Sequence, residues 1–340
     1  MIIGLAATLI STAAVAGEVE HPDVKITLDW AFQGPQSFFL YGLENGRFKA
    51  EGINATVDRG TGSTDVMARV ASGAYDFGWA DIATMIKFSA ENPDNRLVAV
   101  YVTGGNSPLA VITLQGRGIK TPKDLEGRKL GATAGSAAYT LFDAFADSAG
   151  FDAKKVTWQQ LSGQLREPMM VRGDVDAVAG FTTSSLMTVV DLGVPFKNIV
   201  AFRYNDFGVK QYGTAIITRP EFIKKNPKTV AAVVRAINNS LKDAIAKPQE
   251  SVKAIKSRDP LVNLDTECVR LTMGLENLTL TPEFKEKGLS SIDDSRLAAS
   301  IEETAKAFSL KDVPSTDDVF TTAYLPPAKD RMPPALGSCK

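Results

Sequence analysis

Two stretches decide the predicted fold: residues 107–113, with the sequence SPLAVIT, and residues 212–218, with the sequence YGTAIIT. Each is an apolar, extended run bordered by Gly or Pro, a pattern typical of a buried strand. We interpret them as two crossings between lobes, so that the two ends of the chain build one lobe and the middle builds the other. The alternative is one large doubly wound domain.

Strands and helices alternate on both sides of these runs. The pattern predicts strands at 24–28, 54–58, 75–79 and 97–102, and again at 129–132, 156–160 and 177–181, with helices between them and a largely helical region from Pro220 onward. Such a rhythm favours mostly parallel sheets covered on both faces. We therefore predict an α/β protein with two doubly wound lobes. Lobe 1 comprises residues 24–110 and 216–340, and lobe 2 comprises residues 111–215.

Length and composition agree with a soluble protein of two domains. The chain has 340 residues, a net charge of -1, 44% hydrophobic residues and 23% charged residues. One hydrophobic core rarely serves so long a chain. Charges of both signs are mixed and no basic block occurs, which argues against nucleic acid or an anionic membrane surface as a partner.

The N-terminus has the pattern of a secretory signal peptide. Residues 2–10 are apolar or small, and residues 14–16 (AVA) precede Gly17 as an A-x-A cleavage site. We expect cleavage after Ala16, a linker at residues 17–23, and a soluble monomer in the periplasm. The segment has no Lys or Arg before its apolar core, and the alternative is a buried N-terminal helix.

Five segments, in this order and spacing, give the chain a family resemblance. They are residues 28–30 (LDW), 46–53 (GRFKAEGI), 70–78 (VASGAYDFG), 122–131 (PKDLEGRKLG) and 173–177 (GDVDA). The chain resembles the solute-binding proteins of ABC importers, in the branch that binds thiamine-pyrimidine precursors, taurine and alkanesulfonates, or nitrate. The resemblance implies a type II periplasmic-binding fold that closes on its solute about a hinge, and a membrane permease and ATPase as partners.

Ligands of open α/β sheets lie outside the carboxyl ends of the strands, and in a two-lobed protein these ends face a common cleft. The residues that follow the predicted strands are therefore the candidates for ligand binding. They are Asp29, Trp30, Gln33, Gln36, Gly62, Ser63, Thr64, Ala80, Asp81, Ser136, Tyr139, Arg166, Phe181, Thr182 and Asp206.

The first-strand loop indicates the kind of solute. Trp30 can stack on a flat ring, although a tryptophan at a strand end can equally belong to the core. Asp29 and Asp81 can accept hydrogen bonds from ligand N–H groups, or they can cap helices or pair with arginine. Together these residues favour a nitrogen-bearing, pyrimidine-like solute. Sulfonate, nitrate and aromatic acids remain alternatives.

Three further candidates have plainer interpretations as well. Ser63 and Ser136 each precede a predicted helix, where free N–H groups favour anionic or polar ligand groups, but a simple N-cap explains both. Arg166 can bind a carboxylate or phosphate, or it can form a surface salt bridge.

Catalysis by histidine or cysteine is not expected. The chain has one histidine, His21, in the linker, whereas the resemblance implies that related pyrimidine synthases use an active-site His and a Cys-rich segment. Cys268 and Cys339 either form a disulfide or remain two thiols, and no metal-type cluster or phosphate-binding loop occurs. We predict a binding protein without cofactor or metal. A paired-carboxylate hydrolase using Asp29 and Asp81, and a sensory receptor partner of the same fold, are the alternatives.

Overall fold

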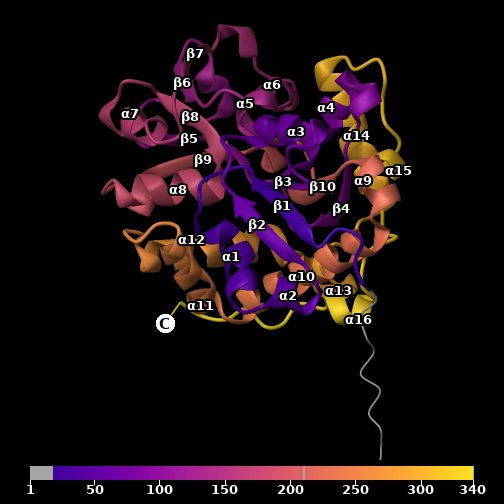
Figure 1. The fold of residues 1–340 in the computed structure, drawn as a ribbon. Helices are drawn as coiled ribbons and strands as arrows, with labels where there is room; N and C mark the ends of the chain where they lie inside the picture. Colours follow the sequence, from indigo (N-terminus) through magenta and orange to yellow (C-terminus); the bar gives the residue numbers. More distant parts are fainter. Residues whose placement is uncertain (1–17, 210, 340) are drawn as a thin grey trace, which may run out of the picture.

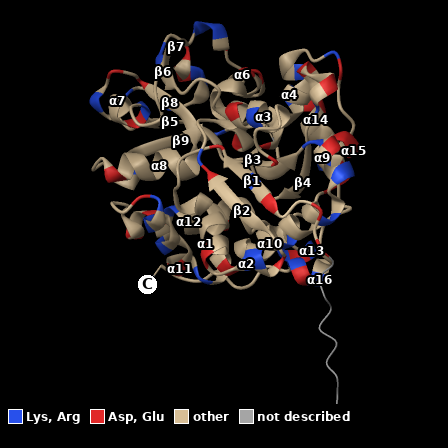
Figure 2. Cartoon of the chain, viewed as in Figure 1, with Lys and Arg blue, Asp and Glu red and all other residues tan. Residues whose placement is uncertain are grey.

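The computed structural model describes residues 18–209 and 211–339, and it consists of two lobes that each contain one five-stranded sheet (Figure 1). The predicted signal peptide, residues 1–16, lies outside the described residues. Within them, no helix is both long and apolar enough to cross a bilayer. Lys and Arg alternate with Asp and Glu over the visible helices (Figure 2), as the mixed sequence charges predict.

The first sheet has the strand order β2-β1-β3-β10-β4. Its strands are β1 (Asp23–Leu28), β2 (Asn54–Asp58), β3 (Phe77–Asp81), β4 (Val98–Val102) and β10 (Thr214–Thr218). β1 pairs in parallel with β2 and β3, and β10 runs antiparallel to β3 and β4. All side chains of β3 and β4 are buried, because helices cover both faces of these strands.

The second sheet repeats this arrangement, with the order β7-β6-β8-β5-β9. Its strands are β5 (Leu109–Leu114), β6 (Lys129–Ala132), β7 (Thr157–Gln160), β8 (Ala177–Phe181) and β9 (Ile199–Arg203). β6 pairs in parallel with β7 and β8, whereas β5 is antiparallel to β8 and β9. In both sheets, therefore, one antiparallel strand is inserted between the last two strands that run in the common direction.

Most helices belong to the first lobe. These are α1 (Ser37–Glu44), α2 (Arg47–Ala50), α3 (Ser63–Ala71), α4 (Ile82–Glu91), α9 (Pro220–Lys225), α10 (Pro227–Ala246), α11 (Pro248–Lys253), α12 (Leu264–Gly274), α13 (Pro282–Lys287), α14 (Asp294–Phe308), α15 (Thr316–Val319) and α16 (Ala328–Arg331). The second lobe contains α5 (Ala137–Thr140), α6 (Phe142–Ala149), α7 (Arg166–Arg172) and α8 (Thr182–Asp191). Helix α14 packs against both α4 and α6, so it contacts the two lobes at once.

The crossings between the lobes include only the first residues of the two apolar runs. The runs themselves form β5 and β10, each of which lies wholly within one sheet. The chain crosses at residues 103–108 and 211–213, where Ser107 N–H donates to Gln211 O (3.2 Å) and Gly213 N–H donates to Gly104 O (2.8 Å). A Cβ atom on Gly213 would stand 2.4 Å from Asn106 O. The apolar pattern thus marks the strand that enters the sheet, while the crossing itself needs glycine for close backbone approach.

Cys268 and Cys339 form a disulfide, with Cα atoms 5.7 Å apart. The bond fastens the C-terminal tail to α12 of the first lobe, so the open question of their pairing is answered by the fold. Neither sulfur is a free thiol, and no group of His, Cys, Asp and Glu among the described residues is placed to hold a metal ion.

Candidate functional site

A small cavity lies between the lobes at the carboxyl ends of the strands, and we call it the polar chamber. It is lined by Asp29, Trp30, Gly62, Ser63, Ser136, Ala137, Arg166, Gly180, Phe181 and Ser184. The first lobe contributes the loop after β1 and the start of α3, and the second contributes the starts of α5 and α7 and the end of β8. Seven of the predicted site residues therefore share one cavity.

Asp29 is buried in this chamber and has few partners. Its Oδ2 accepts a hydrogen bond from Ser63 Oγ (3.4 Å), while its Oδ1 has no partner among the described residues. Burial and, to a smaller extent, the nearby carboxylate of Asp81 raise the pKa of Asp29 to about 7, against hydrogen bonds from Ser63 and Gln36 that lower it. A ligand group that donates a hydrogen bond would complete the coordination of this carboxyl.

Asp81 lies behind the chamber, where it caps α4. Its Oδ1 accepts hydrogen bonds from Thr84 N (2.8 Å) and Thr84 Oγ1 (2.9 Å), which is the capping alternative that its position before a helix suggested. Burial raises the pKa of Asp81 to about 6. Ser63 links the two acids, because its Oγ donates to Asp29 and accepts from Asp81 N (3.3 Å).

Arg166 is buried rather than at the surface, so the surface salt bridge is not what the structure shows. Its guanidinium donates from Nε (2.9 Å) and Nη2 (2.6 Å) to Glu167 Oε1 and from Nη1 to Ala179 O (3.0 Å). It also lies 5.3 Å from the centroid of the Trp30 ring. The charge of Arg166 is therefore balanced within the second lobe, and its planar group supports the indole at the chamber wall.

Several polar atoms near the cleft share the isolation of Asp29 Oδ1. Gln36 Oε1, Thr133 Oγ1 and Ser136 Oγ are buried and have no hydrogen-bond partner among the described residues. Buried polar groups in folded proteins are nearly always hydrogen-bonded, so such a cluster indicates a place where a ligand supplies the missing partners. Asp29 Oδ1, as a carboxylate oxygen, and Gln36 Oε1 can only accept hydrogen bonds, whereas Ser136 Oγ can accept as well as donate.

Two of the predicted residues hold the cleft closed instead of lining it. Ser184 Oγ, on α8, donates to Gln33 Oε1 (2.9 Å), and Thr64 N–H donates to Gly135 O (3.2 Å). Both bonds cross from one lobe to the other. Ser184 was missed as a candidate, although it lies in the first turn of the helix that follows β8 and the strand-end rule would have included it.

The remaining candidates lie elsewhere. Ala80 is inside β3, and Tyr139 packs edge to face on Trp158 (4.9 Å) in the core of the second lobe. Thr182 and Asp206 line a separate surface hollow beside the crossing segment, where Asp206 pairs with Arg203 (2.8 Å). The strand-end rule places a residue near the cleft, but the rotation of its helix or turn decides which way the side chain points.

This architecture, with two sheets of identical order and a cleft at the strand ends, is that of the periplasmic solute-binding proteins. A solved structure from Bordetella bronchiseptica superposes with a TM-score of 0.72 at 18% identity, covering 90% of this chain and 96% of that one. The alkanesulfonate-binding protein of Xanthomonas axonopodis pv. citri, bound to MOPS, superposes with a TM-score of 0.66 at 14% identity, covering 90% and 98%.

The chain belongs to the NMT1/THI5-like family, whose model matches residues 36–251. Two curated relatives extend this result. The formylaminopyrimidine-binding protein of Halalkalibacterium halodurans is 25% identical over 269 residues, which cover 78% of this chain and 76% of the relative. The 4-amino-5-hydroxymethyl-2-methylpyrimidine phosphate synthase of Schizosaccharomyces pombe is 26% identical over 217 residues, and the chain spans 61% of its length.

Proposed function

We propose that this protein captures a small, flat nitrogen heterocycle rich in N–H donors, of the aminopyrimidine type, by closing its two lobes. The observation that carries the proposal is the cluster of buried acceptors without partners, Asp29 Oδ1 and Gln36 Oε1, in a cleft bordered by the Trp30 indole. An aminopyrimidine would offer amino hydrogens to the acceptors and a ring face to the indole.

The charges of the chamber separate this ligand from small oxyanions. Of the described residues, Arg166 is the one cation that lines the chamber, and its charge is balanced by Glu167 at 2.6 Å. Asp29 lines the chamber and Asp81 lies behind it, and neither carboxyl has a cationic partner in the described part of the chain. Bringing a sulfonate or nitrate beside two carboxyls would cost free energy, whereas an amino or amidinium group would gain it. The name of the Halalkalibacterium halodurans relative agrees with this choice.

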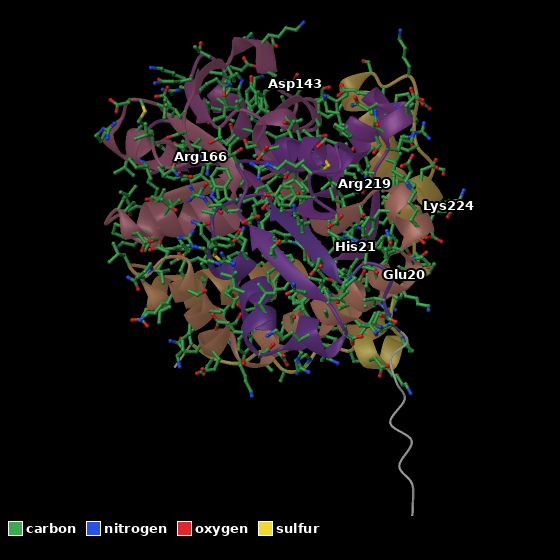
Figure 3. All side chains as sticks on the ribbon, viewed as in Figure 1. Glu20, His21, Asp143, Arg166, Arg219 and Lys224 are labelled. Atoms are coloured by element: carbon green, nitrogen blue, oxygen red, sulfur yellow. A yellow bond between two sulfur atoms is a disulfide. The ribbon has the colours of Figure 1, made fainter. Side chains whose placement is uncertain are left out.

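A binding role is favoured over catalysis. His21, the one histidine of the chain, packs edge to face on Phe222 (5.7 Å) and lies 3.7 Å from Asp76. Figure 3 shows it on the other side of the molecule from Arg166. Both cysteines are in the disulfide. The chamber thus offers neither imidazole nor thiolate, which supports binding without chemical change, in contrast to the relative named as a synthase.

Delivery of the solute to a membrane transporter completes the proposal. The fold is that of proteins that supply ABC importers, so we propose a permease and ATPase complex as the partner, a monomeric state, and action in the periplasm after removal of the signal peptide. No cofactor is required, because closure of the lobes is the whole of the binding event.

A ligand panel tests the proposed function. We expect aminopyrimidines to raise the melting temperature by several degrees, because a ligand at a hundredfold excess over Kd stabilises the folded state by about 2.7 kcal/mol. Methanesulfonate, nitrate and benzoate are tested in the same way, because they represent the alternative classes of solute. Mass spectrometry of the recovered ligand should find it unchanged. Stabilisation by nitrate or sulfonate alone, or conversion of the pyrimidine, would contradict the proposal.

Closure gives a second prediction, at Gly62. Its φ is 147°, and a Cβ atom there would stand 2.7 Å from Gly135 O on the opposite lobe. Gly62→Ala is therefore expected to weaken aminopyrimidine affinity about tenfold or more by obstructing the closed state. The matched control is Gly46→Ala, since Gly46 also has a positive φ of 78° but no atom within 4 Å of its Cβ position.

Calorimetry measures the two affinities, and small-angle scattering measures closure upon ligand addition. The backbone cost differs, because Gly46 (φ 78°, ψ 15°) is in the left-handed region whereas Gly62 (φ 147°, ψ 160°) is in a region that essentially only glycine adopts. Urea unfolding of the ligand-free variants therefore measures this cost separately from the affinities. An equal loss of affinity in Gly46→Ala and Gly62→Ala would show that the interlobe contact has no part in binding.

A further inference from the structure

A second cavity adjoins the polar chamber, and we call it the apolar chamber. Its wall includes Pro35, Phe38, Trp79, Leu241, Leu271 and Leu275 from the first lobe. Pro108, Phe181 and Thr183 of the second lobe complete it, so the space is assembled only when the lobes close. It is a small space of about 50 Å³, and part of it is open to solvent.

Three of the polar residues that line the apolar chamber, Trp79, Thr103 and Thr214, are hydrogen-bonded to one another. Trp79 Nε1 donates to Thr103 Oγ1 (2.8 Å), and Thr103 Oγ1 donates to Thr214 O (2.9 Å). In the polar chamber, by contrast, Asp29 Oδ1 and Ser136 Oγ have no partner among the described residues. A hydrocarbon group entering the apolar chamber would therefore break none of these hydrogen bonds, while a donor-rich group suits the neighbouring polar chamber.

Phe181, at the end of β8, lines both chambers. The next residues of the chain continue this division, because Thr183 lines the apolar chamber and Ser184 lines the polar one. The two spaces are thus neighbours along one strand-to-helix turn. A single ligand that reaches both sides of the Phe181 ring would contact both chambers.

We infer that the natural solute has two parts: a donor-rich heteroaromatic head in the polar chamber, and an apolar arm of a few carbon atoms in the apolar chamber. The inference rests on the proposed function, which supplies the head. The two-part shape follows from the contrast between the two chambers. On one side of Phe181 lie buried acceptors without partners, and on the other side lies a wall that is mainly aromatic and aliphatic.

Calorimetry with 4-aminopyrimidine and its propyl and benzyl derivatives, substituted at ring positions 2, 5 and 6, tests this inference. At least one derivative is expected to bind about tenfold more tightly than the parent, because each buried methylene contributes a factor of about four. In Thr279→Met, the ratio of derivative to parent affinity should fall to about one. Thr279 lines the apolar chamber, and its hydroxyl makes no hydrogen bond to another described residue.

Thr157→Met, on the exposed edge of β7, is the matched control and should preserve the ratio. The inference is overturned if the parent binds but no derivative binds more tightly, or if the gain persists in Thr279→Met. Failure of the proposed function looks different, because then neither the parent nor any derivative binds, and both proposals fall together.

Discussion

Asp29→Asn is expected to change ligand affinity and protein stability in opposite directions. The substitution keeps the size of the side chain but removes the carboxylate that faces the ligand space with a free Oδ1. A hydrogen bond to a charged group is worth about 1.5–3 kcal/mol, so aminopyrimidine affinity should fall about 10- to 100-fold at neutral pH. The unliganded protein should become more stable, because Asn removes the free energy that the unfolded chain gains by ionising Asp29 while the folded chain retains the proton.

The pH dependence follows from the raised pKa. Below pH 4 Asp29 is protonated in both the folded and the unfolded chain. Between pH 4 and pH 7 the unfolded chain releases this proton and the folded chain, with a pKa of about 7, retains it, so the free energy of unfolding falls as the pH rises. The free energy of unfolding of Asp29→Asn should therefore exceed that of the wild type. The difference should grow from pH 4 to pH 7 and then level off at about 2–4 kcal/mol.

Urea unfolding of the ligand-free protein at pH 4, 5, 6, 7 and 8 measures this margin. Asp147→Asn, on the exposed side of α6, is the control and should remain within about 0.5 kcal/mol of the wild type at every pH. Asp81 carries a second raised pKa of about 6, so some pH dependence should persist in Asp29→Asn. A variant that is less stable at pH 7, or that binds with unchanged affinity, would refute the role of Asp29.

Arg166→Met is expected to be the most destabilising single change in the cleft. Glu167 accepts hydrogen bonds from Arg166 Nε and Nη2, and both side chains are almost fully buried, with exposures of 3% and 2%. Without Arg166, the one side-chain hydrogen bond that the described residues still offer to the Glu167 carboxylate comes from Ser185 Oγ (2.6 Å). An unpaired charge in such a place lowers the free energy of unfolding by about 3–5 kcal/mol.

The double variant Arg166→Met/Glu167→Gln separates charge from packing. The double variant should recover at least half of the free energy of unfolding that Arg166→Met loses, because no buried charge remains. Arg172→Met provides the control on the same helix, since Arg172 pairs with Asp174 (2.8 Å) at the surface. This substitution should lower the free energy of unfolding by less than about 1 kcal/mol. If the double variant were as unstable as Arg166→Met, packing of the guanidinium against Trp30 would be the main contribution instead.

Much of the fold was predictable because it depends on local patterns. Strand β1 follows from the alternation of residues 24–28, and the helix-to-strand turn at Gly73 follows from a residue that tolerates a φ of 80°. The predicted crossings lie a few residues further along the chain than the observed ones. The apolar runs identify β5 and β10 but not the glycine-rich residues 103–108 that precede β5.

The candidate site was predictable only as far as the strand ends locate it. Asp29, Trp30, Ser63 and Ser136 each follow a strand and line the polar chamber, and their contact with a ligand stays a prediction. Tyr139 comes from the same reasoning, yet its ring packs on Trp158, since helix α5 turns it toward the core. Strand order says which residues approach the cleft, whereas side-chain direction depends on helix rotation.

By itself, the sequence determined the two-lobed α/β architecture and the family, because periodicity and turn residues act over short stretches of chain. The tertiary structure alone decided that Cys268 meets Cys339, that Arg166 is paired with Glu167 inside the second lobe, and that Asp29 has an atom without a partner. It also assembled the apolar chamber from residues as distant as Phe38 and Leu275. These features arise from contacts between segments far apart in the chain, and desolvation and pairing there depend on what the lobes enclose when they close.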